Sequence, residues 1–484
     1  MPGWNFDHSY ITLPESLFSH VKLEKVAQPE LVLYNQRLDA ELGLHFADKK
    51  NEILADVFSG QLIPADAHPI AQAYAGHQFG YFNMLGDGRA ILLGEHIAPN
   101  GKRYDIQFKG SGLTPYSRRG DGKATLSAML REYLFSEAMH ALGIRTTRSL
   151  AVVKTGEQVI RQDIHDGAVL TRIASSHIRV GTFEYAARLD GKETLQALFN
   201  YTIERHFSHL KGKDDLALAL LNEVMHHQIS LIVEWMRVGF IHGVMNTDNM
   251  SIAGETIDYG PCAFMNTYHP DTVFSSIDTQ GRYAYGNQPY IAQWNLSCLA
   301  GALLKLVDED QNVAIEKVKA ILNDFPRLYN NAWYRIMGRK IGIEVMDESV
   351  MKLVDELLEW MKLTKADYTT TFLYLMETPL PKQAVSIYEE EKFRIWQKEW
   401  QEKVAVSGGL HHAQSIMRNL NPVYIARNYL VEAALDAAVY ENNYRLFQSM
   451  IERLSTPYSF EEGYDEFFLL PERFDHNYKT FCGT

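Results

Sequence analysis

The stretch that decides how this chain folds is His242-Gly243-Val244-Met245-Asn246-Thr247-Asp248-Asn249, with Asp258-Tyr259-Gly260 beginning nine residues after it. It follows the end of an apolar segment at Phe240-Ile241, so we expect a polar loop that leaves buried chain. Asn249 and Asp258 carry oxygen ligands of the kind that Mg²⁺ prefers, with phosphate and water filling the other positions. The pattern therefore predicts a metal and phosphate site, whereas the alternative is a surface loop rich in Asn and Asp.

Protein kinases have a catalytic loop of the form H-x-D-x-x-x-x-N, followed by D-x-G. His242, Asn249 and Asp258 fall in register with that signature, but Val244 stands where the catalytic Asp belongs. Asp248 is the only carboxylate within the loop, which makes it the candidate general base, four residues from the kinase position. The chain is therefore either an inactive kinase or an enzyme that performs different chemistry with ATP.

A glycine turn lies upstream, in a region from Ala71 to Glu95 that suits short strands joined by tight turns. Here Leu85-Gly86-Asp87-Gly88-Arg89 precedes an expected strand over Ala90 to Leu93. The glycines at 86 and 88 let backbone N–H groups approach phosphate oxygens, and Arg89 adds a guanidinium group. A plain hairpin turn is the alternative interpretation.

Lys109 ends a second expected strand, Tyr104 to Phe108, about 20 residues beyond the glycine turn. In a protein kinase, the lysine at this position binds the α- and β-phosphates of ATP and forms an ion pair with a glutamate on the next helix. The apolar period predicts that helix over Thr125 to Leu142. Both Glu132 and Glu137 fit its spacing, and periodicity does not choose between them. The alternative is a solvated lysine before a Gly-Ser-Gly turn.

Two basic segments are more ambiguous. The first is Arg118-Arg119-Gly120-Asp121-Gly122-Lys123. We interpret it as a solvated turn before the helix, with Asp121 or Thr125 as the residue that starts the helix. A loop that faces phosphate is the second interpretation. Arg172 and Arg179 are seven residues apart and share a face if their segment is helical, so that they could clamp an anion. Isolated surface arginines are commoner.

The bulk composition excludes several classes of protein. A net charge of −13 over 484 residues argues against a nucleic-acid footprint, and the 46% hydrophobic content is that of a globular protein. We find no apolar run of about 18 residues and no secretory leader, so we expect no membrane span. Cys262, Cys298 and Cys482 form no disulfide framework, which favours a cytoplasmic protein.

The order of expected elements predicts an α+β fold with two lobes and a ligand in the cleft between them. Strands should include Ser149 to Lys154, Gln158 to Arg161 and a small hairpin over residues 251–257. Helices should include Leu216 to Val238 and Leu303 to Leu322. We divide the chain into an N-terminal extension (1–70), a nucleotide-binding N-lobe (71–185), a helical C-lobe with the catalytic and metal loops (186–330) and a helical C-terminal region (331–484).

With these motifs in place, the chain resembles the selenoprotein O (YdiU) family of kinase-like protein AMP transferases. The resemblance covers most of the chain. It is carried by residues 74–80 (YAGHQFG), 85–90 (LGDGRA), 107–112 (QFKGSG), 115–122 (PYSRRGDG), 131–133 (REY), 242–249 (HGVMNTDN), 258–261 (DYGP) and 417–422 (MRNLNP).

The resemblance implies a protein-kinase-like fold that binds ATP in a flipped orientation, with the α-phosphorus open to attack by protein Ser, Thr or Tyr hydroxyls and with loss of pyrophosphate. It implies Asp248 as the base, Asn249 and Asp258 as ligands of Mg²⁺ or Mn²⁺, and Glu132 as the partner of Lys109. It also implies that ATP is contacted by Gly86, Gly88, Arg89, Lys109, Asp121, Gly122, Arg172 and Arg179. Redox proteins are among the expected acceptors.

The flip gives a reason for Val244, since a base placed for γ-phosphoryl transfer would be misaligned with the α-phosphorus by several ångströms. The resemblance implies that eukaryotic relatives carry selenocysteine third from the C-terminus, where this chain has Cys482. We hypothesise a redox-sensitive bridge from Cys482 to Cys262 or Cys298. The rival functions are UMP transfer from UTP, a conventional kinase with a relocated base, and a pseudokinase scaffold. The complete set of Lys109, Glu132, Asn249 and Asp258 argues against the scaffold.

Overall fold

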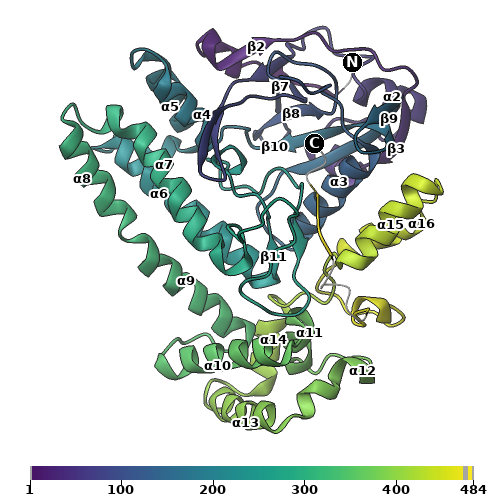
Figure 1. Cartoon of the computed structure of the whole chain (residues 1–484), viewed down its shortest axis with the longest axis vertical. Coiled ribbons are helices and arrows are strands. Elements are labelled where there is room, and N and C mark those ends of the chain that lie inside the picture. The colour runs from purple at the N-terminus through teal and green to yellow at the C-terminus, as the bar shows by residue number, and fades with distance from the viewer. Residues whose placement is uncertain (1–2, 472–477, 482–484) are drawn as a thin grey trace.

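The computed structural model describes residues 3–471 and 478–481. Figure 1 shows a strand-rich lobe at the top of the molecule and a helical region below it, as the sequence predicts. The elements of the last third of the chain divide between two places. Helices α10 (Glu348–Thr364) to α14 (Leu410–Arg418) lie at the bottom. In contrast, α15 (Asn428–Tyr440) and α16 (Arg445–Leu454) return to the side of the strand-rich lobe and pack against α3 (Leu126–Ala141).

The strand-rich lobe is built on one antiparallel sheet, which in the described residues has eight strands in the order β2-β4-β7-β8-β10-β9-β3, with β1 paired to β7. Residues before position 35 supply three of these strands. A separate hairpin of β5 and β6 lies off the sheet. The bounds are β1 Phe6–Asp7, β2 Phe18–His20, β3 Glu30–Tyr34, β4 Ile70–Gln72, β5 Ala75–Gln78, β6 Tyr81–Met84, β7 Ala90–Ile97, β8 Arg103–Lys109, β9 Arg148–Ile160 and β10 Ile164–Ala174.

The two faces of β8 differ in chemistry because side chains alternate along a strand. Ile106 and Phe108 belong to a hydrophobic core under the sheet. Asp105, Gln107 and Lys109 are polar and nevertheless buried. One face of this strand therefore stabilises the lobe, and the other presents buried polar groups that require partners.

Helix α3 (Leu126–Ala141) covers that lobe and confirms the predicted helix. Thr125 is its N-cap, accepting a hydrogen bond from the N–H of Ala128 at 3.3 Å, and Gly143 follows its end with φ of +76°. The helix packs on β9 and β10. It thereby brings Glu132 against the sheet.

The helical region is centred on α6 (Leu216–Val238), which packs against α7 (Gln288–Val307) and α9 (Phe325–Lys340). By length and composition α6 is the one helix among the described residues that could cross a membrane, but 56% of its most apolar window is buried inside the molecule, and the absence of a membrane span stays a prediction. A core helix has this composition too. The other helices are α1 Gln36–Leu42, α2 Asn51–Phe58, α4 Val180–Arg188, α5 Glu193–His206, α8 Gln311–Leu322, α10 Glu348–Thr364, α11 Tyr368–Leu375, α12 Lys382–Val385, α13 Glu391–Val406, α14 Leu410–Arg418, α15 Asn428–Tyr440 and α16 Arg445–Leu454.

Three local predictions are wrong. The strands expected at Ser149 and Gln158 are one strand, β9. The helix expected from Leu303 is two, because Asp310 caps a new helix, α8. Residues 251–257 form no hairpin, since Ser251 bridges to Arg179 and Thr256 to Thr146. This segment instead connects the two lobes.

Candidate active site

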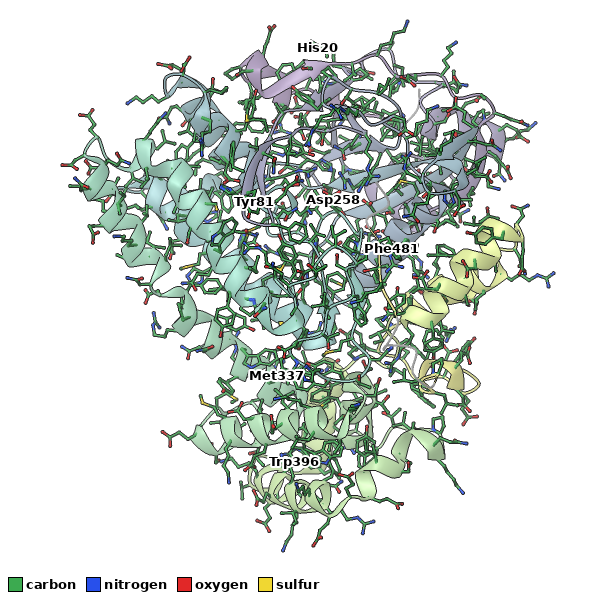
Figure 2. The ribbon with its side chains drawn as sticks, viewed as in Figure 1. His20, Tyr81, Asp258, Met337, Trp396 and Phe481 are labelled. Atoms are coloured by element: carbon green, nitrogen blue, oxygen red, sulfur yellow. The ribbon has the colours of Figure 1, made fainter. Side chains whose placement is uncertain are left out.

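Asp258 lies between the two lobes, as Figure 2 shows, at the meeting point of three cationic side chains. Its Oδ1 accepts hydrogen bonds from Lys109 Nζ at 2.7 Å and Arg172 Nη1 at 2.5 Å, and its Oδ2 accepts one from Arg179 Nη1 at 3.0 Å. Burial raises the pKa of this carboxyl, but the three cations outweigh burial and hold the pKa well below its usual range. A single carboxylate therefore gathers the three positive charges.

The arginines reach Asp258 from different elements, so the condition of a helical segment under which they would share a face is not met. Arg172 is in strand β10, whereas Arg179 precedes α4 as its N-cap. Both side chains are buried, 1% and 3% exposed, which excludes the alternative of isolated surface arginines. Arg179 also lies over the ring of Tyr74, at 4.4 Å from its centroid.

Lys109 ends β8 and forms a second ion pair, with Glu132 on α3, at 2.6 Å. Arg172 Nη1 contacts the other oxygen of Glu132 at 3.2 Å. The other candidate that periodicity allowed, Glu137, instead pairs with Arg148 at 2.8 Å. A strand lysine paired with a helix glutamate is the arrangement of a protein kinase.

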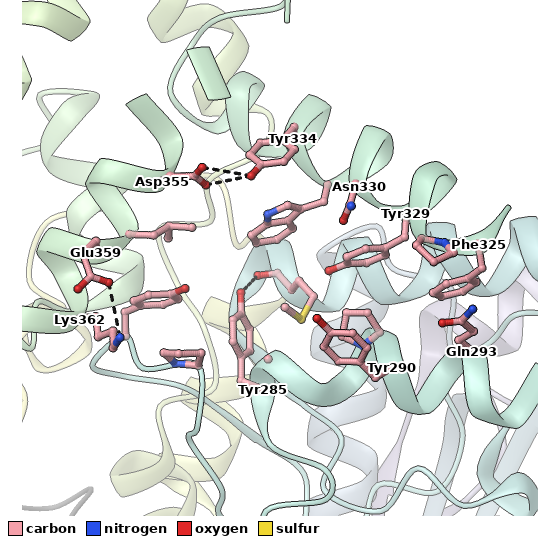
Figure 3. A pocket seen from close by; sticks show the side chains of 18 residues that line it. Tyr285, Tyr290, Gln293, Phe325, Tyr329, Asn330, Tyr334, Asp355, Glu359 and Lys362 are labelled. Carbon is pink, nitrogen blue, oxygen red and sulfur yellow. Dashed lines mark hydrogen bonds and ion pairs between the residues drawn. The ribbon is translucent and has the colours of Figure 1, made fainter. Parts of the chain in front are cut away.

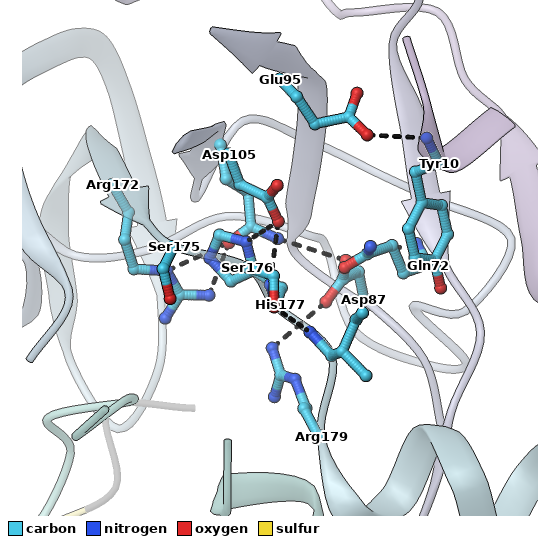
Figure 4. A network of polar contacts seen from close by, with 12 residues as sticks. Tyr10, Gln72, Asp87, Glu95, Asp105, Arg172, Ser175, Ser176, His177 and Arg179 are labelled. Atoms are coloured by element: carbon cyan, nitrogen blue, oxygen red, sulfur yellow. Dashed lines mark hydrogen bonds and ion pairs between the residues drawn. The ribbon is translucent and has the colours of Figure 1, made fainter. Parts of the chain in front are cut away.

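A buried polar layer behind the two arginines was missed by sequence reasoning (Figure 4). Arg172 donates through Nε and Nη2 to Gln107 Oε1, at 3.0 and 2.5 Å, and Gln107 Nε2 donates to Asp87 Oδ2 at 3.2 Å. Asp87 Oδ1 lies 3.6 Å from Arg179 Nη2. Burial raises the pKa of Asp87, and Arg179 opposes that shift. Gln107 and Asp87 thus link the two arginines.

The sequence does contain a signal for this layer. Asp105, Gln107 and Lys109 alternate with Ile106 and Phe108, so the strand presents three polar side chains on one face. Gln107 is the cross-strand partner of Arg172 in the sheet register, which places the two side chains on the same face. Register is a long-range property, and for that reason the strand alone does not reveal the partner.

Asp248 lies in a short 3₁₀ turn, η4 (Thr247–Asn249), and is 7% exposed. Its backbone carbonyl accepts a hydrogen bond from Arg179 Nη1 at 2.8 Å, and its Oδ1 has no hydrogen-bond partner among the described residues. Burial raises the pKa of Asp248 to about 6, with Arg179 opposing. A buried carboxylate with an unoccupied acceptor atom has the properties that a general base requires.

The loop around Asp248 is fixed by His242 and Asn249. His242 Nδ1 accepts a hydrogen bond from the N–H of Val244 at 3.4 Å, and Nε2 donates to the carbonyl of Ile257 at 2.9 Å. Burial lowers the pKa of His242, which keeps the ring neutral. Asn249 Nδ2 donates to the carbonyl of Val244 at 3.0 Å, so that Oδ1 is the atom with which the predicted metal would be bound. His242 therefore has a structural role, tying the catalytic loop to the segment before Asp258.

The glycine loop is held against the segment 114–117. A side chain at Gly86 would place its Cβ 2.4 Å from the ring of Tyr116, and φ is +135° there. Ser117 Oγ donates to the carbonyl of Gly88 at 2.5 Å. Arg89 follows this loop and immediately precedes β7. A residue larger than glycine at position 86 would therefore displace the ring of Tyr116.

Asp121 does not join the group around Asp258 in this structure. It is 41% exposed and pairs with Arg161 Nη1 at 2.8 Å, and that hydrogen bond lowers its pKa. Gly122 lies beside the loop after Lys109, since a Cβ there would meet the carbonyl oxygen of Gly112 at 2.0 Å. This geometry matches the solvated turn more closely than a phosphate-facing loop.

A cavity of about 490 Å³ lies away from these residues, between α7, α9 and α10 (Figure 3). Aromatic rings line it, including those of Tyr285, Tyr329 and Trp333. Tyr334 donates to Asp355 at its edge, at 3.1 Å. None of the predicted site residues contributes to its lining.

The cysteine hypothesis is tested only in part. Cys482 lies outside the described residues. Cys262 is buried, and its carbonyl accepts a hydrogen bond from Arg131 at 2.7 Å. The described tail reaches the same loop, because Thr480 Oγ1 donates to the carbonyl of Pro261 at 2.7 Å. Cys298 is on α7. The bridge therefore stays a hypothesis.

Known proteins give a consistent comparison. A family model described as "Protein adenylyltransferase SelO" matches residues 3–455. Proteins named "Protein nucleotidyltransferase YdiU" are similar along the whole chain. That of Bacillus cereus (strain ZK / E33L) is 50% identical, and the match covers 100% of this chain and 99% of the relative. That of Bacillus cytotoxicus is 52% identical, and the match covers 100% of this chain and 98% of the relative.

Among solved structures, ROP2 from Toxoplasma gondii, described as a virulence factor with a protein-kinase fold and no enzymatic activity, is matched at 11% identity. The match covers 69% of this chain and 87% of that one, with a TM-score of 0.23. An overlap this low supports no inference about this chain. Its kinase-like arrangement is defined instead by the two lobes, the Lys109–Glu132 pair and Asp258.

Proposed function

Because the chain belongs to the SelO family of protein adenylyltransferases, we propose that it moves AMP from ATP to Ser, Thr or Tyr hydroxyls of proteins. Protein nucleotidyl transfer is the activity named for its relatives. The proposal is that the nucleotide is ATP, that it binds flipped relative to a kinase, and that the attacked atom is its α-phosphorus.

The observation that carries this proposal is the set of contacts of one carboxylate. Lys109, Arg172 and Arg179 all donate to Asp258, with no carboxylate at position 244. Three buried cations exceed what one metal ligand needs, but they match a polyphosphate. When phosphate oxygens enter, these cations exchange a shared carboxylate for several negative oxygens.

Asn249 and Asp258 fit a hard divalent cation, since they offer one amide oxygen and one carboxylate oxygen and leave positions for phosphate and water. Mg²⁺ or Mn²⁺ held there would neutralise phosphate charge during transfer. The proposed roles of the nucleotide-contacting residues are those that the resemblance implies, for Gly86, Gly88, Arg89, Lys109, Asp121, Gly122, Arg172 and Arg179. For Asp121 that role requires release from Arg161.

The proposed reaction forms a bond between the acceptor oxygen and the α-phosphorus and breaks the bond from the α-phosphorus to the bridging oxygen of pyrophosphate. Asp248 takes the proton from the acceptor hydroxyl through its carboxylate. Pyrophosphate leaves with the bridging oxygen and its electron pair. Arg179 donates both to the carbonyl of Asp248 and to Asp258, so that it fixes the base relative to the phosphate site.

Mass spectrometry of an acceptor protein tests this function. The full chain is incubated with Mg²⁺ or Mn²⁺ and either ATP or UTP, and pyrophosphate is measured in parallel. We expect an AMP adduct on hydroxyl side chains and one pyrophosphate for each adduct. A UMP adduct with UTP only would make the chain a uridylyltransferase, and a phosphate adduct would make it a kinase. We also propose a cytoplasmic location and redox proteins among its acceptors, and we retain the four-region division of the chain as a proposal.

A further inference from the structure

A group of metal-binding side chains lies outside the proposed active site. His77 on β5, Glu184 on α4 and Cys298 on α7 place their ligand atoms within 4.8 Å of one another. His77 Nδ1 contacts Glu184 Oε1 at 2.5 Å. Three segments that are far apart in sequence thus bring one imidazole, one carboxylate and one thiol to a single point.

An unpartnered atom points to a ligand at this place. The side chain of Glu184 is 5% exposed, and its Oε2 has no hydrogen-bond partner among the described residues. A buried carboxylate oxygen without a partner is costly, and a cation would satisfy it. The His77 side chain is 22% exposed, so the group is accessible from solvent.

We propose that His77, Glu184 and Cys298 bind one Zn²⁺-class transition-metal ion. Nitrogen, oxygen and sulfur donors are the ligands of zinc sites, and three protein ligands leave a fourth position for water. A thiolate and an imidazole select zinc or cobalt over Mg²⁺, which prefers oxygen ligands only. On binding, the metal–sulfur bond replaces the S–H bond of Cys298, and the proton goes to solvent.

The position of this site in the fold connects metal binding to the loop that carries Asp248. The N–H of His77 donates to Thr247 Oγ1 at 2.7 Å, which ties the β5–β6 hairpin to the turn that carries Asp248. The preceding residue, Gly76, lies against Asp248 itself. A metal that joins β5 to α4 and α7 would hold this hairpin in place over the catalytic loop.

Cobalt binding tests the site directly, because thiolate ligation gives Co²⁺ a sulfur-to-metal charge-transfer absorption that oxygen ligands do not give. The full-length protein, stripped with a chelator, is titrated with Co²⁺ in excess Mg²⁺, which occupies oxygen-only sites. We expect one Co²⁺ for each chain with the charge-transfer band, its displacement by one Zn²⁺, and a rise in the melting temperature.

The variants separate this site from others. Cys298→Ala should abolish the band, and Glu184→Gln should weaken Co²⁺ binding by at least about 10-fold, the lower limit for changes even beyond the direct ligands. The double variant Cys262→Ser/Cys482→Ser should keep the band, since Cys298 is then the one cysteine left. His209→Ala should keep it too, because His209 and Glu223 form a separate surface pair.

Three results would overturn the proposal: no charge-transfer band in the unmodified protein, a band that survives Cys298→Ala, or Co²⁺ uptake that His209→Ala removes. Circular dichroism of each metal-free variant shows whether it is folded. Glu184→Gln leaves the thiol and the shape of the site intact, so that it provides a second test should Cys298→Ala not fold.

Discussion

At the scale of single residues, the central feature is the difference in environment between two aspartates that are ten positions apart, Asp248 and Asp258. Asp258 is surrounded by cations, which hold its pKa low. Asp248 has an oxygen with no hydrogen-bond partner in the described part of the chain, and burial raises its pKa to about 6. Enzymes use environments that separate two carboxyl pKa values in this way to give the two groups different roles, which supports the proposal of Asp248 as the base and Asp258 as a metal ligand. Val244 does not need to be a carboxylate if Asp248 accepts the proton.

The first prediction concerns Asp248. Asp248→Asn keeps the size of the side chain and removes its ability to accept a proton. We expect the turnover number to fall by about 10²- to 10⁴-fold, the usual contribution of a general base, while the dissociation constant of ATP changes little. Steady-state transfer rates and calorimetric ATP titration measure the two effects. Turnover within about tenfold of the unmodified enzyme would remove Asp248 from the role of base.

The second prediction concerns Gly76, whose backbone lies against Asp248. A Cβ at this position would come within 2.3 Å of Asp248 Oδ1, so that Gly76→Ala must displace the carboxylate. A shift of about 1 Å can cost about 10²-fold in rate, and we expect a loss of that order in turnover.

Gly301→Ala is the matched control for Gly76→Ala, because a Cβ at Gly301 in α7 meets no atom within 4 Å. It should leave turnover unchanged and raise the free energy of unfolding by about 0.5–1 kcal/mol. If Gly76→Ala and Gly301→Ala are equally active, the close approach of the β5–β6 hairpin to Asp248 has no catalytic importance.

The third prediction is a pH dependence of stability that arises from Glu255. Burial raises the pKa of this partly buried carboxyl to about 7 from 4.5, and its Oε2 accepts a hydrogen bond from the N–H of Ser175 at 3.1 Å. Between these values the folded protein binds more protons than the unfolded chain, so the free energy of unfolding falls as pH rises from 4.5 to 7.

Glu255→Gln should flatten that part of the stability curve. The difference between the two proteins can reach about 3 kcal/mol, at 1.36 kcal/mol for each pKa unit. Urea unfolding at several pH values measures it. Parallel curves for the two proteins across this window would show that Glu255 does not titrate there.

At the scale of elements, sheet register creates the site. Gln107 on β8 and Arg172 on β10 are cross-strand partners, and Asp87 joins them from the glycine turn. Their hydrogen bonds orient the guanidinium group of Arg172 before any phosphate binds. This is how an antiparallel sheet can hold a charged group with little freedom.

The elements also show what a sequence can and cannot reveal. Periodicity predicts α3 and α6 because apolar positions repeat within a single segment, and the Lys109 strand is equally local. The break before α8 depends on Asp310, whose capping role only becomes evident once the helix is seen to end. Arg172 and Arg179 converge from a strand and a helix N-terminus, and that convergence depends on tertiary packing. The family resemblance implies a role for both arginines in binding ATP, whereas their spacing places them on one face only if the segment is helical, which it is not.

At the scale of the whole molecule, the site joins regions that the chain separates widely. Asp258 follows the 251–257 segment, which bridges to both Thr146 and Arg179, and Lys109 comes from the sheet. The C-terminal helices return to α3, where Arg131 pairs with Glu432 at 3.0 Å. A ligand that contacts Lys109 and Asp258 should therefore stabilise both lobes together.

The fourth prediction follows from this coupling. ATP with Mg²⁺ at 100 times its dissociation constant should raise the free energy of unfolding by about 2.7 kcal/mol. Removing Mg²⁺ with a chelator should reduce that gain, because the carboxylate of Asp258 then repels phosphate instead of sharing a cation with it. Thermal unfolding followed by fluorescence measures the gain. An equal gain with and without Mg²⁺ would contradict the assignment of Asn249 and Asp258 as metal ligands.

The measurement that tests the central claim most directly is label transfer from ATP tagged on either the α- or the γ-phosphorus. The purified chain is incubated with Mg²⁺ or Mn²⁺ and an acceptor protein, and labelling of both proteins is recorded. The flipped-nucleotide account predicts transfer of the α-label alone, with its loss in Asp248→Asn. Transfer of the γ-label alone would show a kinase with a relocated base and would contradict the account.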